Sequence, residues 1–304
     1  MKGSNNIKFL DDCLLIEDTL VIGDVHIGYD SQFHGMAVFP NVQIENIIEK
    51  LEKVFENLES EKFKVRKVVL LGDVKHDFGG ISDIEWRDTI RFLDYLKSKV
   101  GKIVVIKGNH DMVLEPILKK RGISLRNHYK VKIKNGGRVW FMHGDKMFKQ
   151  CLDDGVNRGL NGRGVGKKIG KVLRGGIGRV NSGGNVEKED INKDIFVFGH
   201  LHPAIVLNDE YKSEKYKCFL EGEWKGRRVF VLPSFSSASL GFDLSEVDKL
   251  NERERVSRSG RKIKGKFFVI DGKDLKKFRV VVYDNKENKE YRFGRLGDLI
   301  GLVS

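Results

Sequence analysis

Five apolar runs in this sequence are each followed closely by aspartate, histidine or asparagine. The clearest lies in residues 102–112, KIVVIKGNHDM, where an apolar β-branched run leads to Gly108, Asn109, His110 and Asp111. Such a run is typical of a fully buried parallel strand. Because ligands bind at the carboxyl ends of strands in open α/β sheets, the polar residues after this run are candidate site residues.

The same arrangement occurs four more times along the chain. The segments are LVIGDVH at 20–26, VVLLGDV at 68–74, VWFMHGD at 139–145 and IFVFGHLH at 195–202. Five of the eight histidines fall in these motifs, and a sixth, His76, lies just beyond one of them. Chance is a poor explanation for such repetition, so we expect the motifs to converge at one end of a sheet.

Helices are expected between these strands. Apolar residues recur at i, i+3 and i+4 spacing after Asn41, which predicts an amphipathic helix packed on the sheet. Ser82 and Glu85 have the spacing of a capping box and predict the start of a second helix, and Gly122 is placed to end a short third helix. The alternation of strands and helices predicts a layered α/β fold with a largely parallel centre.

The second half of the chain has a different texture. Beyond Asn127, short strand-like segments are separated by polar turns, and the tail includes GKFFVID at 265–271 and FRVVVYD at 278–284. We expect residues 1–245 to form the main domain. Residues 246–304 are expected to be a strand-rich C-terminal extension that can pack on it.

The net charge of +13 is unevenly distributed. Residues 155–185 contain 11 glycines and seven basic residues but no acidic or aromatic residue. A segment with so few apolar residues cannot offset its ordering entropy, so we expect a mobile basic insertion. It can follow a phosphate backbone electrostatically, or it can be a solvated loop that charge keeps soluble.

Composition also bears on the cellular setting. The sequence has no run of roughly 18 apolar residues and does not start like a signal peptide, which predicts a cytoplasmic protein without membrane attachment. The three cysteines are far apart and show no C-x-x-C spacing, so neither a disulfide framework nor a cysteine zinc site is expected.

The strand-end residues offer two carboxylates, one amide oxygen and four imidazoles. They are Asp24, His26, Asp73, Asn109, His143, His200 and His202. This mixed set suits two divalent first-row metals better than magnesium or calcium, which prefer oxygen ligands. Two metals can lower the pKa of a shared water and clamp both oxygens of a displacement at phosphorus. The set therefore indicates phosphate-ester hydrolysis, although any one of these residues alone would more often be a turn residue or a packed histidine.

In order along the chain, these motifs resemble those of the calcineurin-like metallophosphoesterase superfamily. The matching segments are Asp24-x-His26, Gly72-Asp73, Gly108-Asn109-His110-Asp111, His143 and Gly199-His200-x-His202. The resemblance covers residues 14 to about 240 and is strongest to the archaeal and bacterial branch related to the DNA double-strand-break repair nuclease. It implies an α/β fold built as a two-sheet β-sandwich flanked by helices, in four αββα layers.

The resemblance also implies a role for each matched residue. One metal would be held by Asp24, His26, Asp73 and His202. The other would be held by Asp73, Asn109, His143 and His200. The expected metal is manganese, with iron, zinc and nickel as alternatives. A hydroxide bridging the two metals would be the nucleophile, and His110, with its ring oriented by Asp111, would contact the phosphate and stabilise or protonate the leaving oxygen.

The chain departs from the superfamily pattern at one position. Many members carry aspartate three residues after the bridging Asp73, where this chain has His76 followed by Asp77. In the nuclease-like branch a histidine commonly occurs there, which implies that His76 helps to bind the ester group. His34 and His128 match no motif and are expected on the surface or in packing.

These inferences favour a metal-dependent phosphodiesterase that acts on nucleic acid or nucleotides, with DNA or RNA as the expected partner. A phosphomonoesterase acting on proteins or small metabolites is the alternative within the enzyme class. A non-catalytic nucleic-acid-binding scaffold is a third hypothesis, but that class usually loses ligands, and all seven positions are intact here. The related nucleases often pair, so a homodimer is allowed, although no interface is legible in the sequence.

Overall fold

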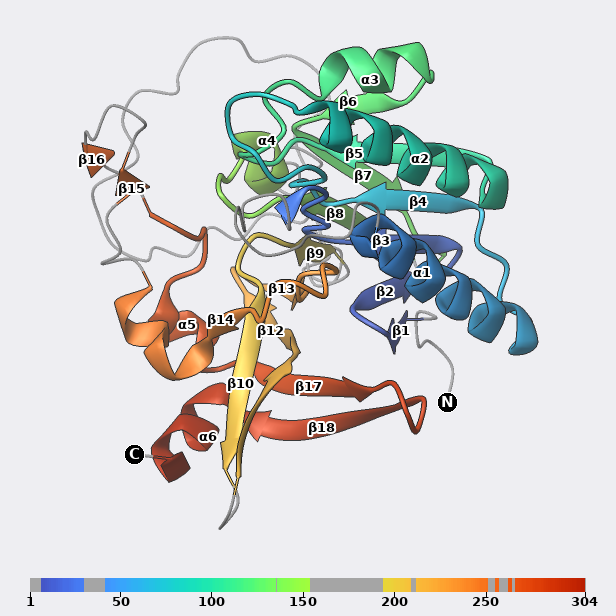
Figure 1. Ribbon diagram of the computed structural model, residues 1–304. Coiled ribbons are helices and arrows are strands. Elements are labelled where there is room, and N and C mark those ends of the chain that lie inside the picture. Colours follow the sequence, from blue (N-terminus) through green and yellow to red (C-terminus); the bar gives the residue numbers. More distant parts are fainter. Residues whose placement is uncertain are drawn as a thin grey trace, which may run out of the picture.

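Two β-sheets lie face to face in the computed structural model, and helices flank them (Figure 1). The structure describes residues 7–29, 42–134, 136–153, 194–208, 212–250, 255–256, 262–263 and 266–303. The predicted basic insertion at 155–185 and His34 lie outside the described residues. The fold is the mixed α/β sandwich that the resemblance implied.

The first sheet contains six strands in the order β1-β2-β3-β4-β5-β6. Their bounds are β1 Ile7–Leu10, β2 Cys13–Ile16, β3 Thr19–Ile22, β4 Lys67–Leu70, β5 Lys102–Ile106 and β6 Ser124–Arg126. The strands from β3 to β6 are parallel to one another, whereas β1 and β2 are joined to them by antiparallel pairing. The strands predicted before Asp24, Asp73 and Asn109 are thus confirmed as β3, β4 and β5, in the parallel part of this sheet.

The second sheet contains seven strands in the order β18-β17-β12-β13-β9-β8-β7. Their bounds are β7 His128–Lys132, β8 Arg138–Met142, β9 Ile195–Phe198, β12 Phe219–Trp224, β13 Arg227–Val231, β17 Arg279–Asp284 and β18 Lys289–Arg295. β8, β9 and β13 are parallel, and the remaining pairs are antiparallel. Two strands of the C-terminal extension, β17 and β18, therefore continue the sheet that carries the last two site motifs.

Apolar side chains on the inner faces of both sheets form the central core. Val21, Val69 and Val104 come from the first sheet, and Phe141 and Val197 come from the second. Their alternation with residues that point outward follows from the two-residue period of a strand. This shared core fixes the two sheets against each other, so the ends of their strands can build one site.

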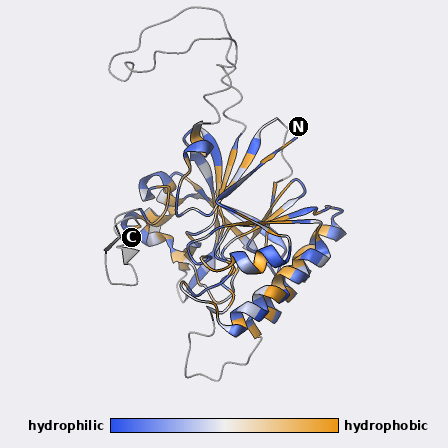
Figure 2. Cartoon of the chain, turned by 90° about the horizontal axis from the view of Figure 1, so that it is seen from above, coloured by the Kyte–Doolittle hydropathy of each residue, from blue (hydrophilic) through white to orange (hydrophobic). Residues whose placement is uncertain are grey.

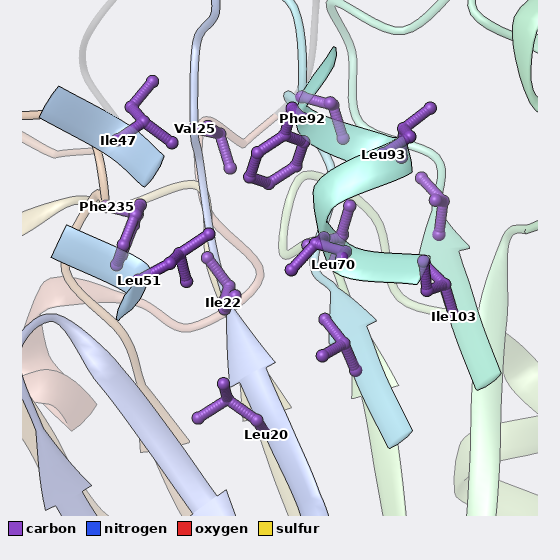
Figure 3. Close-up of a cluster of buried hydrophobic side chains, with 14 of the residues drawn as sticks. Leu20, Ile22, Val25, Ile47, Leu51, Leu70, Phe92, Leu93, Ile103 and Phe235 are labelled. Atoms are coloured by element: carbon purple, nitrogen blue, oxygen red, sulfur yellow. The ribbon is translucent and has the colours of Figure 1, made fainter. Parts of the chain in front are cut away.

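Three helices cover the outer face of the first sheet. They are α1 Val42–Ser60, α2 Asp83–Lys99 and α3 Glu115–Lys120. Figure 3 shows side chains of α1 and α2, including Ile47, Leu51 and Phe92, gathered with Ile22 and Leu70 of the strands beneath. Helix ribbons carry both hydrophobic and hydrophilic colours (Figure 2), as expected for helices with one buried face.

The predicted helix signals are also confirmed in detail. α2 begins with the capping box: the amide of Glu85 donates to Ser82 Oγ at 3.1 Å, and the amide of Ser82 donates to Glu85 Oε2 at 3.1 Å. After α3, Gly122 has φ +66°, a conformation that glycine adopts without strain.

Shorter elements cover the outer face of the second sheet. They are β10 Pro203–Asn208, β11 Ser213–Lys217, β14 Phe242–Asp243, the 3-10 helix η4 Leu244–Lys249, α5 Gly272–Leu275 and α6 Leu296–Val303. An apolar cluster joins Leu244, Leu275 and Leu296 to Phe198 and Val229 of the sheet. The remaining elements are α4 Lys149–Asp153, β15 Arg255–Val256 and β16 Lys262–Ile263.

The predicted strand at 265–271 is wrong. Its described part, from Lys266 to Asp271, is irregular, although Phe268 and Ile270 are buried and alternate with partly exposed neighbours. The burial alternation therefore has the period of a strand, but a loop packed on the second sheet produces it here. Among the residues that the structure describes, no helix combines the length and apolar character needed to cross a bilayer.

Candidate metal centre

The carboxyl ends of five strands meet at one edge of the sandwich. β3, β4 and β5 are neighbours in the first sheet, and β8 and β9 are neighbours in the second. The amide of His200, after β9, donates to Asp24 Oδ2, after β3, at 2.9 Å. Likewise His143 Nε2, after β8, lies 3.3 Å from Asp73 Oδ2, after β4. The two sheets thus contribute to one cluster, as the repeated motif predicted.

Five of the candidate ligands have backbones in the left-handed region. The φ values are +53° at Asp24, +50° at His26, +49° at Asp73, +66° at His200 and +50° at His202. This conformation costs on the order of 1 kcal/mol or more per residue and is found preferentially at functional sites. Hydrogen bonds between the turns hold it in place, including that from the amide of His26 to the carbonyl of Asp73, at 2.9 Å.

Two glycines allow these turns to approach each other closely. A Cβ atom on Gly108 would lie 2.1 Å from Asp73 Oδ1, and one on Gly72, where φ is +97°, would lie 2.7 Å from His143 Nδ1. Any side chain at either position would displace a candidate ligand. The glycines of the predicted motifs are therefore required by the close packing of the site.

One donor group consists of Asp73, Asn109, His143 and His200. His143 Nδ1 donates to the carbonyl of Leu71 at 2.7 Å, and His200 Nε2 donates to the carbonyl of Phe267 at 3.0 Å. These contacts place the ring protons on the outer nitrogens, so His143 Nε2 and His200 Nδ1 carry lone pairs. The two nitrogens lie 3.0 Å apart, and His143 Nε2 is also 3.0 Å from Asn109 Oδ1.

A second donor group consists of Asp24, His26 and His202, whose donor atoms lie within 4.8 Å of one another. Nε2 of His202 lies 3.1 Å from Asp24 Oδ1 and 3.4 Å from His26 Nε2. Asp24 Oδ1 is buried and forms no hydrogen bond with any described residue. A buried carboxylate oxygen without a hydrogen bond is costly unless something else satisfies it.

Both groups fit divalent cations by the chemistry of their donors. In the group around His143, lone pairs of two imidazoles and of a carboxylate point toward one another, which is a repulsive arrangement that a cation makes attractive. Asp73 Oδ2 links the groups, because it lies 3.3 Å from His143 Nε2 and 4.0 Å from His26 Nε2. The buried Asp24 Oδ1 supplies the independent sign that a partner belongs there.

The electrostatics of the cluster agree with a cation site. Burial lowers the pKa of His143, but the negative charges of Asp73 and Asp24 outweigh it and raise that pKa to about 10. Burial raises the pKa of Asp73, but His143 and His26 outweigh it and hold the value well below the ordinary range. The negative charge that favours a proton on His143 also favours a metal ion in its place.

His110 lies beside these two donor groups but belongs to neither of them. Its Nε2 is 3.8 Å from Asp73 Oδ2, and its Nδ1 donates to the carbonyl of His76. Asp111 forms no hydrogen bond with this ring, unlike what the resemblance implied: its carboxylate accepts from the amides of Val74 and Gly108, each at 3.0 Å. Asp111 therefore holds the turns after β4 and β5 together, and the His76 carbonyl orients the ring.

His76 lies next to the cluster, as its position in the sequence suggested. Its Nδ1 is 3.3 Å from His26 Nδ1, and its ring stacks on that of His110 with centroids 5.4 Å apart. Donor atoms of His26, His76 and His110 form a third group with metal-ligating potential. Burial, followed by the charge of His110, lowers the pKa of His76, which favours its neutral form. All ten candidate residues are thus gathered at this edge of the sandwich.

Sequence reasoning missed the groups that orient the ligands. Besides the carbonyls of Leu71 and Phe267, Ser234 Oγ donates to the carbonyl of Asp24 at 2.7 Å, and Ser239 Oγ lies 3.5 Å from His202 Nδ1. Main-chain carbonyls carry no sequence signal. The serines belong to the segment LPSFSSASLGFDL, which the sequence indicates as a loop without placing it near the site.

Comparison with known proteins gives a family match and distant structural similarities. The family model described as calcineurin-like phosphoesterase matches residues 18–204. The structure of nuclease MPE from Pseudomonas putida is similar at 13% identity and a TM-score of 0.45, covering 94% of both chains. A Vps29 variant from Entamoeba histolytica is similar at 16% identity and a TM-score of 0.33, covering 90% of this chain and 97% of that one.

A protein of unknown function from Aquifex aeolicus has 17% identity and a TM-score of 0.30, covering 63% of this chain and 81% of its own. These three TM-scores are too low to carry an argument about function. No curated protein matches the chain.

Proposed function

The chain belongs to the calcineurin-like phosphoesterase family of hydrolases, and we propose that it is a dinuclear metal-dependent phosphodiesterase acting on nucleic acid or nucleotides. The observation that carries the dinuclear proposal is the position of Asp73, whose Oδ2 faces His143 Nε2 in one donor group and His26 Nε2 in the other. A carboxylate between two groups of lone pairs suits a ligand shared by two cations.

In this proposal each donor group holds one cation. Asp24, His26 and His202 would bind one, and Asn109, His143 and His200 would bind the other. Asp73 would be shared. Manganese, iron, zinc and nickel all accept this mixture of oxygen and nitrogen, and manganese is our first choice. When bound, the cations would lower the pKa of a water at the site and neutralise charge on the phosphate.

The remaining residues would act on the substrate. His110 faces Asp73 with Nε2 while its Nδ1 is fixed by the His76 carbonyl, so Nε2 is the atom that can donate to a phosphate or leaving oxygen. His76 would contact the ester group from the same side. Asp111, buried under both turns, would keep the spacing between Asp73 and His110.

The proposal of a nucleic-acid substrate rests on the charge of the chain and on its sequence resemblance to the nuclease-related branch. The chain carries a net charge of +13, and seven basic residues within 155–185 contribute without any opposing acidic residue. Such a distribution attracts polyphosphates through counterion release, with little dependence on base sequence. DNA or RNA is therefore the proposed partner.

The first test compares hydrolysis of bis(p-nitrophenyl) phosphate with that of p-nitrophenyl phosphate, each with added manganese and with a chelator. We expect metal-dependent cleavage that is faster for the diester and is abolished in Asp73→Asn. Faster cleavage of the monoester would replace the proposal with a phosphomonoesterase. Binding of DNA that survives Asp73→Asn, together with no hydrolysis of either ester, would favour a scaffold.

A further inference from the structure

Phe78 lies against the ring of His110 although it is half exposed. The two ring centroids are 3.5 Å apart with planes tilted by 33°, and Phe78 is 52% exposed. One part of the ring is thus covered by the residue proposed to contact the phosphate, while the rest is open to solvent. Because about half of its surface is open to solvent, the ring offers an apolar face that a ligand can cover.

Two other exposed apolar residues belong to chain segments that carry site residues. Met112 is 65% exposed and follows the turn that carries His110. Leu240 is 71% exposed and follows Ser239, whose hydroxyl lies 3.5 Å from His202 Nδ1. Of these three residues, Phe78 has a side chain that contacts a site residue, through the ring of His110. Met112 and Leu240 add exposed apolar residues in the chain segments next to the site.

A buried carboxylate anchors both ends of the loop that carries Phe78. Glu85, which is 2% exposed, accepts from the amides of His76 at 3.3 Å and Asp77 at 2.9 Å. It also accepts from the amide of Ser82, at 3.1 Å, which closes the loop onto the first turn of α2. The backbone on both sides of Phe78 is therefore anchored, and its ring contacts His110, which limits the ordering entropy lost when a ligand packs on it.

A row of rings lies beside the donor cluster on this side. His76 stacks on His110 with centroids 5.4 Å apart, and Tyr29 meets His76 edge to face at 4.6 Å. Phe78 belongs to the same row through His110. Flat aromatic surfaces beside a phosphate site match a ligand in which planar groups are linked by phosphates.

We propose that Phe78 is a specificity-determining residue that stacks on an unpaired nucleobase next to the scissile phosphate. This inference rests on the proposed phosphodiesterase function and names its substrate class as single-stranded nucleic acid or a dinucleotide. Bases inside a duplex are already stacked on each other, so only an unpaired base can use the ring. Stacking on an aromatic ring depends little on which base is present. It would also supply an aromatic contact, which the basic segment 155–185 cannot provide because it has no aromatic residue.

The test uses two substrates with one phosphodiester each and the same charge. Thymidylyl-thymidine carries both bases, and its analogue with two abasic tetrahydrofuran residues carries none. The readout is the ratio of kcat/KM for the two substrates, measured with manganese in wild type, Phe78→Leu and Phe78→Trp. Tyr291→Leu, which removes an aromatic ring from β18, is the matched control.

We expect the wild type to prefer the substrate with bases, and Phe78→Leu to reduce that ratio about tenfold, whereas Phe78→Trp and Tyr291→Leu keep it. An unchanged ratio in Phe78→Leu would overturn the inference and indicate that the ring is only an apolar contact, as for an alkyl chain. Cleavage of bis(p-nitrophenyl) phosphate with no preference between the dinucleotides would also overturn it, yet leave the phosphodiesterase intact.

If the wild type cleaves no diester, the proposed function fails and binding decides the inference. Calorimetry then compares thymidine 5′-phosphate with ribose 5-phosphate, which has no base. Tighter binding of the nucleotide in wild type but not in Phe78→Leu would support stacking. Equal binding of the two phosphates in both proteins would overturn it.

Discussion

The carboxylate of Asp73 reaches across the sandwich, so that its Oδ2 lies 3.3 Å from Nε2 of His143, although the two residues follow strands of different sheets. The same oxygen lies 4.0 Å from Nε2 of His26. A single side chain therefore contacts both donor groups, and its removal should affect both.

We expect Asp73→Asn to lose bound metal and to lower phosphodiester turnover by about 100-fold or more. The amide keeps the size of the side chain but removes the negative charge that two cations would share. Metal content by mass spectrometry and hydrolysis of bis(p-nitrophenyl) phosphate can be measured on the same sample. Asp18→Asn, which changes a carboxylate just before β3, is the control. Full metal content in Asp73→Asn would contradict the shared-ligand role.

His110→Ala should separate chemistry from metal binding. We expect turnover to fall by roughly 100-fold or more while metal content stays near that of the wild type, since general acid catalysis contributes about this much. The reason is positional: the Nδ1 of His110 is fixed by the His76 carbonyl, and its Nε2 is 3.8 Å from Asp73 Oδ2. Loss of metal in proportion to activity would assign His110 to the ligands instead.

The sequence was sufficient to predict the part of the site that follows from strand ends. A β-branched run such as that before Asn109 is buried on both faces, so its end and the polar residue beyond it are legible without a structure. The capping box at Ser82 and Glu85 was equally legible, because its spacing is local. What the local pattern could not show is that Glu85 also holds the loop of Phe78.

The contacts that hold the site together were not predictable, because they join residues far apart in the chain. The carbonyl of Phe267 orients His200, yet its segment was predicted as a strand because it is an apolar run between polar turns. Lys217 Nζ donates to the carbonyls of Ser234 at 2.8 Å and Ser236 at 2.6 Å, under the loop that supports Asp24. From the sequence alone, a lysine in a polar segment is expected at the surface, and only the fold shows that most of the Lys217 side chain is covered.

A partly buried ion cluster under that loop should make stability depend on pH. Lys50 and Lys217 lie 2.5 Å and 3.3 Å from Asp12 Oδ2. Burial raises the pKa of Asp12, but the two lysines outweigh it, so the pKa lies below its ordinary value. A carboxyl group whose pKa is lower in the folded than in the unfolded state stabilises the fold at pH values above its unfolded-state pKa, which is near 4. This stabilisation is lost as the pH falls below that value toward the folded-state pKa.

We therefore expect Asp12→Asn to destabilise the protein by about 3 kcal/mol at pH 7, because it leaves the ammonium group of Lys217 without a carboxylate partner among the described residues and leaves Lys50 with Asp11 alone. Asparagine tolerates the positive φ of this position, +54°, so the backbone is little affected. Urea unfolding at pH 7, 5 and about 3 would measure the difference, which should shrink below about pH 4. Asp94→Asn, which removes an exposed partner of Arg121, should cost less than about 1 kcal/mol. A difference that is the same at every pH would show that charge is not the cause.

Neutralising the basic segment should separate affinity for nucleic acid from chemistry. We expect a variant with its seven basic residues between 155 and 185 changed to glutamine to hydrolyse bis(p-nitrophenyl) phosphate like the wild type. Its affinity for single-stranded DNA should fall, and the slope of log affinity against log salt should become shallower, because fewer counterions are released on binding. A variant in which residues 155–185 are deleted gives the same comparison without the segment, so agreement between the two assigns the effect to charge. Unchanged affinity and slope in both would mean that the segment is a solvated loop, and that the remaining positive charge of the chain carries whatever binding there is.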